Sequence, residues 1–138
     1  MTGRFEILEH TADIGLRLTA RTPGEIFEAA AEGLAILQGA WFPGEGVERE
    51  VEVAAGDREA LLVAWLDEVL YLQDAEDVVF GGFHVEEEGD RRLRARMLTA
   101  PRGDRGLEAA GVKAATYHRL RFAQDSNGRW SADVYLDV

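Results

Sequence analysis

The stretch that decides the fold runs from Asp57 to Leu72 and reads DREALLVAWLDEVLYL. Its large apolar residues recur at spacings of three and four, at Leu61, Leu62, Trp65, Leu66, Val69 and Leu72. This period is typical of an amphipathic α-helix. Asp57 precedes the run, where an aspartate side chain can cap a helix N-terminus. We therefore expect a helix that begins at Asp57 and buries Trp65.

A second helix is expected upstream of this one. Thr22 supplies a capping hydroxyl, Pro23 suits the first turn and Glu25 completes a capping pattern. An apolar face follows, made by Ile26, Phe27, Ala30, Leu34 and Leu37. Gly39 is placed to end the helix, because glycine readily adopts the left-handed conformation of a helix C-terminus.

The remaining segments alternate between apolar and polar residues, which is typical of strands. The expected strands are 4–8, 14–18, 47–53, 78–88, 91–98, 112–122 and 130–138. Gly89-Asp90 and Asn127-Gly128 are turn signals that join two pairs of them as hairpins. We therefore expect an α+β fold, a single domain over residues 1–138, with two main helices on a largely antiparallel sheet.

Composition excludes several functions. The 138 residues include no cysteine, so disulfides, thiolate zinc sites and cysteine nucleophiles are excluded. A net charge of −11 argues against a protein whose main role is to bind nucleic-acid backbones. The first residues lack the apolar core of a signal peptide, and no apolar run is long enough for a bilayer. We expect a cytoplasmic protein with no membrane association.

One basic stripe needs an explanation. Arg92, Arg94 and Arg96 alternate with apolar residues, so their side chains share one face of a strand. An RNA-binding surface is one interpretation. Cross-strand pairing with Glu86 and Glu88 of the expected hairpin explains the pattern better.

The histidines give no catalytic motif by themselves. His10, His84 and His118 lack the short helical spacing of a metalloprotease motif, and no nucleophile motif or phosphate-binding glycine loop accompanies them. Each of the three is interpreted as a structural hydrogen-bonding group.

Two acids at strand ends indicate a candidate metal site. Asp13 follows His10-Thr11-Ala12 between the first two strands, and Asp137 lies near the end of the last strand. The terminal carboxylate of Val138 would add a third anionic donor. If the first and last strands are neighbours, these groups could gather oxygen ligands for a hard cation such as calcium or magnesium. Spacing alone leaves exposed, unrelated acids as the alternative.

Four segments in order resemble the archease family over nearly the whole chain. The family's N-terminal signature is similar to residues 5–15, FEILEHTADIG, and its long helix to residues 60–72. Its third motif is similar to residues 112–118, VKAATYH, with Ala115 where a larger apolar residue is expected. Its apolar-Asp-aliphatic C-terminus is similar to residues 135–138, YLDV.

The resemblance implies a divalent-metal site and a role without catalysis. The matching ligands here are Asp13, Asp137 and Val138, for calcium, magnesium or manganese. The implied role is activation of an RtcB-type RNA ligase in tRNA splicing or RNA repair, with RNA met only indirectly. That ligase uses GTP and manganese to guanylylate its own histidine, and the family promotes this step and multiple turnover. Lys113 and His10 are further expected contact residues, although Lys113 could also protect a strand edge.

Two other functions stay open from the residues. A free-standing metal-dependent hydrolase would use the same acids and would need His10 or His118 as general base. A chaperone-like adaptor would need no metal. Turnover by the pure protein would favour the hydrolase, whereas activity seen only with an added ligase would favour the activator.

Overall fold

The computed structural model describes residues 3–9, 13–107 and 109–138. His10 therefore lies outside the described residues. The elements follow the chain in the order β1 (Arg4–Glu9), β2 (Asp13–Ala20), α1 (Pro23–Leu37), β3 (Val47–Ala54), α2 (Arg58–Glu76), β4 (Val78–Glu87), β5 (Arg92–Pro101), β6 (Ala114–Gln124) and β7 (Trp130–Asp137). The expected α+β class with two helices is confirmed.

The described strands form two antiparallel sheets, not one. The four-stranded sheet has the order β1-β2-β7-β6, and the three-stranded sheet has the order β3-β5-β4. The sequence did not predict this division, because pairing between distant strands leaves no local pattern. The last strand therefore pairs with the second strand, and the first strand lies beyond it at the sheet edge.

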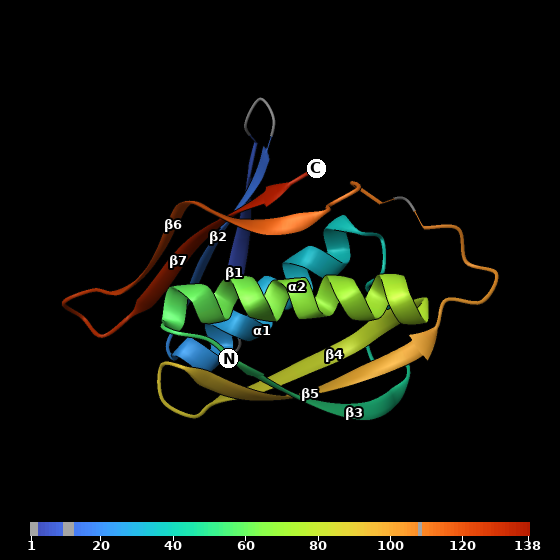
Figure 1. The fold of residues 1–138 in the computed structure, drawn as a ribbon, viewed down its shortest axis with the longest axis horizontal. Helices are drawn as coiled ribbons and strands as arrows, with labels where there is room; N and C mark the ends of the chain where they lie inside the picture. The colour runs from blue at the N-terminus through green and yellow to red at the C-terminus, as the bar shows by residue number, and fades with distance from the viewer. Residues whose placement is uncertain (1–2, 10–12, 108) are drawn as a thin grey trace.

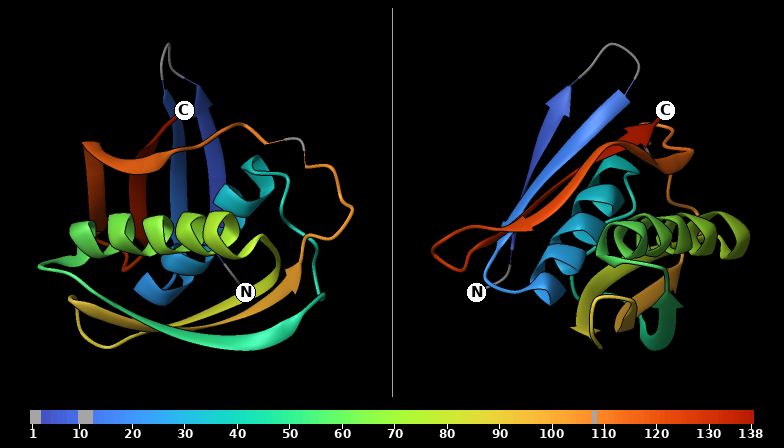
Figure 2. Two further views of the ribbon diagram at one scale, coloured as in Figure 1. Left: turned by 45° about the vertical axis from the view of Figure 1, so that its right-hand side comes forward. Right: turned by 60° about the vertical axis from the view of Figure 1, so that its left-hand side comes forward.

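Both helices lie between the two sheets (Figures 1 and 2). Helix α1 contacts β2 of the larger sheet and β4 of the smaller one, while α2 contacts β6 and β3. A helix covered on two sides must bury a wide arc of its surface. This accounts for Val63, which the three-and-four pattern omitted but which is buried with the rest of the α2 core.

The helix ends match the expected capping residues. Thr22 Oγ1 accepts a hydrogen bond from the Glu25 amide at 3.2 Å, and Asp57 Oδ1 accepts one from the Ala60 amide at 2.8 Å. After α1, Gly39 has a φ of +66°, and the Ala40 amide donates to the Ala35 carbonyl at 2.8 Å. Each bond satisfies a backbone group that a helix end leaves without an intrahelical partner.

Trp65 is a core residue, as expected. Its side chain is fully buried, and its indole Nε1 donates to the Phe27 carbonyl of α1 at 2.9 Å. The bond pairs the one polar atom of this side chain, so its burial leaves no unsatisfied donor. Trp65 therefore ties α2 to α1 at the centre of the molecule.

Candidate functional site

One end of the four-stranded sheet brings the two predicted acids together. Asp13, the first residue of β2, is the cross-strand partner of Asp137, the last residue of β7. On the other side of β7, Ala114 of β6 is also opposite Asp137. Side chains directly opposite on neighbouring antiparallel strands lie on the same face. Asp13 and Asp137 therefore share a face at the end of the sheet.

Lys113 lies at the same end. It immediately precedes β6, and its backbone amide donates to the Asp137 carbonyl at 2.7 Å. Its side chain is exposed, as are Asp137 and Val138. Lys113 is also the only lysine in the chain, which has fourteen arginines. The third sequence motif and the C-terminal motif thus meet through a backbone hydrogen bond.

The Asp13–Asp137 pair fits a cation only if a third donor joins it. Among the described residues, no three Asp, Glu or His side chains gather closely enough to hold a metal. Two carboxylates directly opposite each other repel, which disfavours strand pairing at this point. The Val138 carboxylate would complete an all-oxygen donor set, which is the set that calcium, magnesium and manganese prefer.

Another carboxylate on this face is neutralised by the protein itself. Asp133 lies opposite both Arg17 and Arg121, and it accepts hydrogen bonds from them at 3.0 and 3.4 Å. Burial acts to raise the pKa of the Asp133 carboxyl, but the two arginines outweigh burial and hold that pKa below its ordinary value. Asp133 is thus held as a paired anion, unlike the opposed carboxylates at the end of the sheet.

On this face of β7, Tyr135 lies between Asp133 and Asp137. A Cβ placed on Gly15 would lie 2.8 Å from Tyr135 Cε2 and 3.0 Å from Leu8 Cβ. The Tyr135 ring therefore occupies the space that the absent Gly15 side chain leaves open. The His118 ring meets it edge-on, with ring centroids 6.2 Å apart.

His118 is poorly placed to serve a metal at the Asp13–Asp137 pair. It lies four residues beyond Ala114 along β6, roughly 13 Å of extended strand. The β6–β7 pairing is irregular between Thr116 and Arg121, and Arg119 there has a φ of +55°. The hydrolase interpretation therefore loses one of its two candidate bases, and the other, His10, lies outside the described residues.

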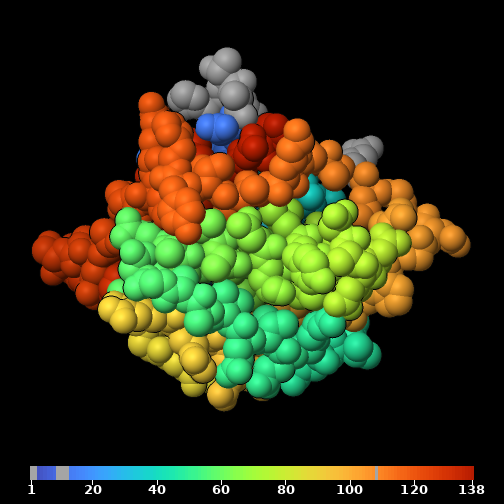
Figure 3. All heavy atoms as spheres, viewed as in Figure 1, coloured from blue at the N-terminus to red at the C-terminus, as the bar shows by residue number. Residues whose placement is uncertain are grey.

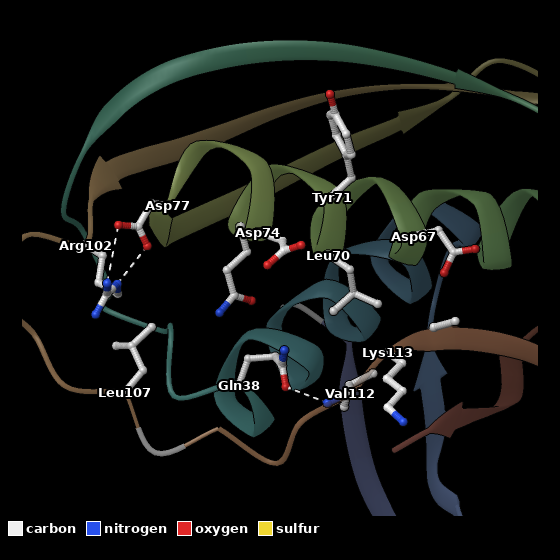
Figure 4. Close-up of a pocket in the computed structure, with 12 residues that line it drawn as sticks. Gln38, Asp67, Leu70, Tyr71, Asp74, Asp77, Arg102, Leu107, Val112 and Lys113 are labelled. Carbon is white, nitrogen blue, oxygen red and sulfur yellow. Dashed lines mark hydrogen bonds and ion pairs between the residues drawn. The ribbon is translucent and has the colours of Figure 1, made fainter.

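Lys113 also lines a groove, together with Arg102. The groove has a volume of about 810 Å³ and lies between α2 and the segments 102–107 and 109–114 (Figure 4). Its polar lining includes Gln38, Asp67 and Asp74, none of which sequence reasoning singled out as a site residue. The available signal was the spacing of Asp67 and Asp74 on the face of the helix that carries Leu70.

Charge pairing accounts for the middle arginine of the β5 stripe. Arg94 lies 3.6 Å from Glu88 of the hairpin, and 3.7 and 3.5 Å from Glu50 and Glu52 of β3. The expected pairing is therefore confirmed for Arg94 with Glu88, and β3 adds two partners that the sequence did not predict. Among the described residues Arg92 and Arg96 form no ion pair, and Glu86 lies against His84 instead, so the alternative of an RNA-binding surface stays open.

The model of the Archease protein family matches residues 5–138 of this chain. The chain belongs to the archease family. Curated archeases from Thermococcus gammatolerans and Pyrococcus furiosus are 41% and 36% identical to it, and each alignment covers 98% of this chain and 99% of the relative. The family resemblance expected from the four motifs is confirmed.

Two solved structures agree with the fold. The solution structure of Protein 1598 from Methanobacterium thermoautotrophicum superimposes with a TM-score of 0.75 and 29% identity, covering 97% of this chain and 98% of that one. The crystal structure of a Thermotoga maritima archease, described as a possible chaperone, gives 0.62 and 24% identity, covering 96% of each chain. Within the described residues, no helix is long and apolar enough to cross a membrane. The cytoplasmic location stays a prediction.

Proposed function

We propose that this archease-family protein activates an RtcB-type RNA ligase without catalysing a reaction itself, and that it holds a divalent cation at Asp13, Asp137 and the Val138 carboxylate. The single observation that carries the proposal is the cross-strand pairing of Asp13 with Asp137 beside Lys113. Three sequence motifs that are far apart in the chain supply these residues. Such convergence at an exposed sheet end suits contact with a partner.

A bound cation would supply positive charge between the opposed carboxylates. Asp13 and Asp137 would then fasten β7 to β2 instead of repelling each other across the pair. The exposed Lys113 ammonium, held near by its backbone bond to Asp137, would be free to contact an anion. A compact ammonium suits a phosphate, so Lys113 is assigned to the nucleotide phosphates or an acidic group of the guanylylating ligase. The GTP belongs to the ligase, and RNA is met through the ligase.

Reconstitution tests this proposal directly. The ligase is assayed at limiting concentration with GTP and manganese, with and without the purified protein, and both guanylylation and the number of turnovers are measured. Wild-type protein should raise both, and Asp137→Asn should lose this effect. Asp104→Asn is the matched control, because Asp104 is an exposed aspartate in the 102–106 loop.

The same assay separates the other functions. RNA joining or phosphatase turnover by the protein without ligase would support a hydrolase. Activation that is equal for wild type and Asp137→Asn would support an adaptor that needs no metal. Both outcomes contradict the proposed function.

A further inference from the structure

The groove beside Lys113 has one acidic wall. Asp67, Leu70, Asp74 and Asp77 line it from α2 and its C-terminal end, and their spacings of three, four and three place them on one face of the helix. Leu107 and Val112 contribute apolar surface from the opposite side. Figure 3 shows α2 open to solvent between β6 and β3, and the three aspartates are exposed. The groove thus combines an apolar floor with regularly spaced carboxylates.

Two of these carboxylates, Asp67 and Asp74, have no cationic partner among the described residues. Asp77 is paired with Arg102 at 2.7 Å. Asp67 Oδ1 accepts only the Ala115 amide, at 2.9 Å, and no ion pair to Asp74 exists among the described residues. Asp67 and Asp74 are two helical turns apart, or roughly 10 Å along the axis. Arg102 and Lys113 also line the groove, but Arg102 is paired with Asp77, so the two carboxylates on the α2 wall attract a cationic group.

Gln38 gives an independent indication of a ligand. Its side chain is only 8% exposed, and its Oε1 accepts from the Val112 amide at 3.1 Å. Its Nε2 has no partner among the residues that the structure describes, and Figure 4 shows this nitrogen directed toward α2, into the groove. The side chain is largely buried, but this nitrogen reaches the open groove, where an acceptor on a ligand can take the place of water. A carbonyl oxygen in the groove would be such an acceptor.

We infer that this groove binds a short basic segment of a protein partner. An arginine or lysine of the segment meets Asp67 and Asp74, a neighbouring apolar side chain covers Leu70 and Val112, and a main-chain carbonyl accepts from Gln38. The inference rests on the proposed function for the partner's identity, the ligase, but not for the segment's chemistry. The same carboxylates argue against single-stranded RNA as the occupant.

Titration with short peptides, followed by amide chemical shifts, tests the inference. The probe is acetyl-Leu-Arg-Leu-amide, with acetyl-Leu-Gln-Leu-amide and a short oligouridylate for comparison. The arginine peptide should shift amides of residues 67–77 and 109–114, leave the 88–91 turn unchanged, and bind at least tenfold more tightly than the glutamine peptide. Equal binding of the two peptides, absence of shifts in the groove, or groove shifts caused by the oligouridylate would overturn the inference.

Two substitutions sharpen the test. Asp74→Lys should weaken peptide binding at least tenfold, whereas Glu59→Lys, the same charge change elsewhere on exposed α2, should change it less than twofold. Gln38→Glu keeps an acceptor for the Val112 amide but removes the donor. It should therefore weaken binding even though its added negative charge would strengthen a purely electrostatic attraction. Equal effects of the two lysine substitutions, or tighter binding by Gln38→Glu, would contradict the assigned contacts.

The ligase assay separates this inference from the proposed function. If the peptide binds but the protein activates no ligase, the proposed function is contradicted, whereas the inference that the groove binds a basic segment stands. If Asp74→Lys no longer binds the peptide but still activates the ligase fully, the groove is not where the ligase docks. That result would overturn the inference and leave the proposed function standing.

Discussion

Asp13 and Asp137 are cross-strand partners at the end of the four-stranded sheet, although 124 positions separate them in the chain. Like charges opposed in this way destabilise strand pairing unless something compensates them. Four residues earlier on the same face of β7, Asp133 is compensated by two arginines. Because Asp133 is neutralised in this way, whereas no compensating cation for the Asp13–Asp137 pair is found among the described residues, the proposed metal ion would compensate that pair.

Removing the charge of Lys113 should abolish ligase activation without affecting the fold. Its backbone bond to Asp137 does not involve the side chain, so Lys113→Ala should keep its melting temperature within about 2 °C, as expected for an exposed substitution of less than about 0.5 kcal/mol. Activation is measured as ligase turnover number. Full activation by a folded Lys113→Ala protein would return this residue to the role of protecting a strand edge.

The single lysine allows a chemical control. Acetylation of the wild type removes the positive charge at Lys113, whereas reductive dimethylation keeps it. The acetylated protein should lose activation and the dimethylated one should retain it. The amino terminus reacts in both cases, so Lys113→Ala treated in the same way measures its contribution. Equal activation by the two modified wild-type proteins would show that the charge is irrelevant.

Gly15 should tolerate no side chain while Tyr135 is present. Gly15→Ala places a methyl group 2.8 Å from Tyr135 Cε2, and overpacking of this kind costs about 1–3 kcal/mol of unfolding free energy. In urea unfolding, Tyr135→Ala should recover part of that loss, so the double variant should be less destabilised than the sum of the single ones. Gly56→Ala is the control, because no heavy atom lies within 4 Å of the position that its methyl group would take. Strict additivity would mean that the ring does not occupy the space over Gly15.

Acid should remove the stabilisation that Asp133 provides. Its folded-state pKa lies below the ordinary value of 3.8, so the contribution is complete above that pH and is lost as pH falls through the lower folded-state pKa. Asp133→Asn should reduce the free energy of unfolding at neutral pH by about 1 kcal/mol, since both arginines are about half exposed. Below the folded-state pKa of Asp133 the variant and wild type should converge. Urea unfolding across pH measures this, with Asp104→Asn as control, and a constant difference down to the lowest pH would exclude the assigned pairs.

The helices were predictable from sequence because their determinants are local. The three-and-four spacing through Trp65, and the caps Thr22 and Asp57, act within a few residues of the elements that they define. The two sheets were not predictable in this way, because β2 pairs with β7 across most of the chain length. Alternation identifies a strand and its faces but not its neighbour.

The residues of the candidate site could likewise be predicted from the sequence only in part. Asp13 and Asp137 could be named from strand ends and from the family resemblance, but the residue pairing itself required the sheet order. Gln38 could not be singled out, because a glutamine after a helix is an ordinary feature of sequence, and the spacing of Asp67 and Asp74 indicates a shared helix face but not a groove. They share a groove because residues 102–107 and 109–114 fold back against α2.

Calorimetric titration of wild type, Asp13→Asn and Asp137→Asn with calcium, magnesium and manganese tests the central claim most directly. Wild type should bind one divalent ion, and an excess of about a hundredfold over the dissociation constant should stabilise it by about 2.7 kcal/mol. Each variant should lose the binding heat together with ligase activation, whereas Asp104→Asn should keep both. Equal binding by all four proteins would contradict the assigned site, and activation that survives both Asp13→Asn and Asp137→Asn would contradict its role.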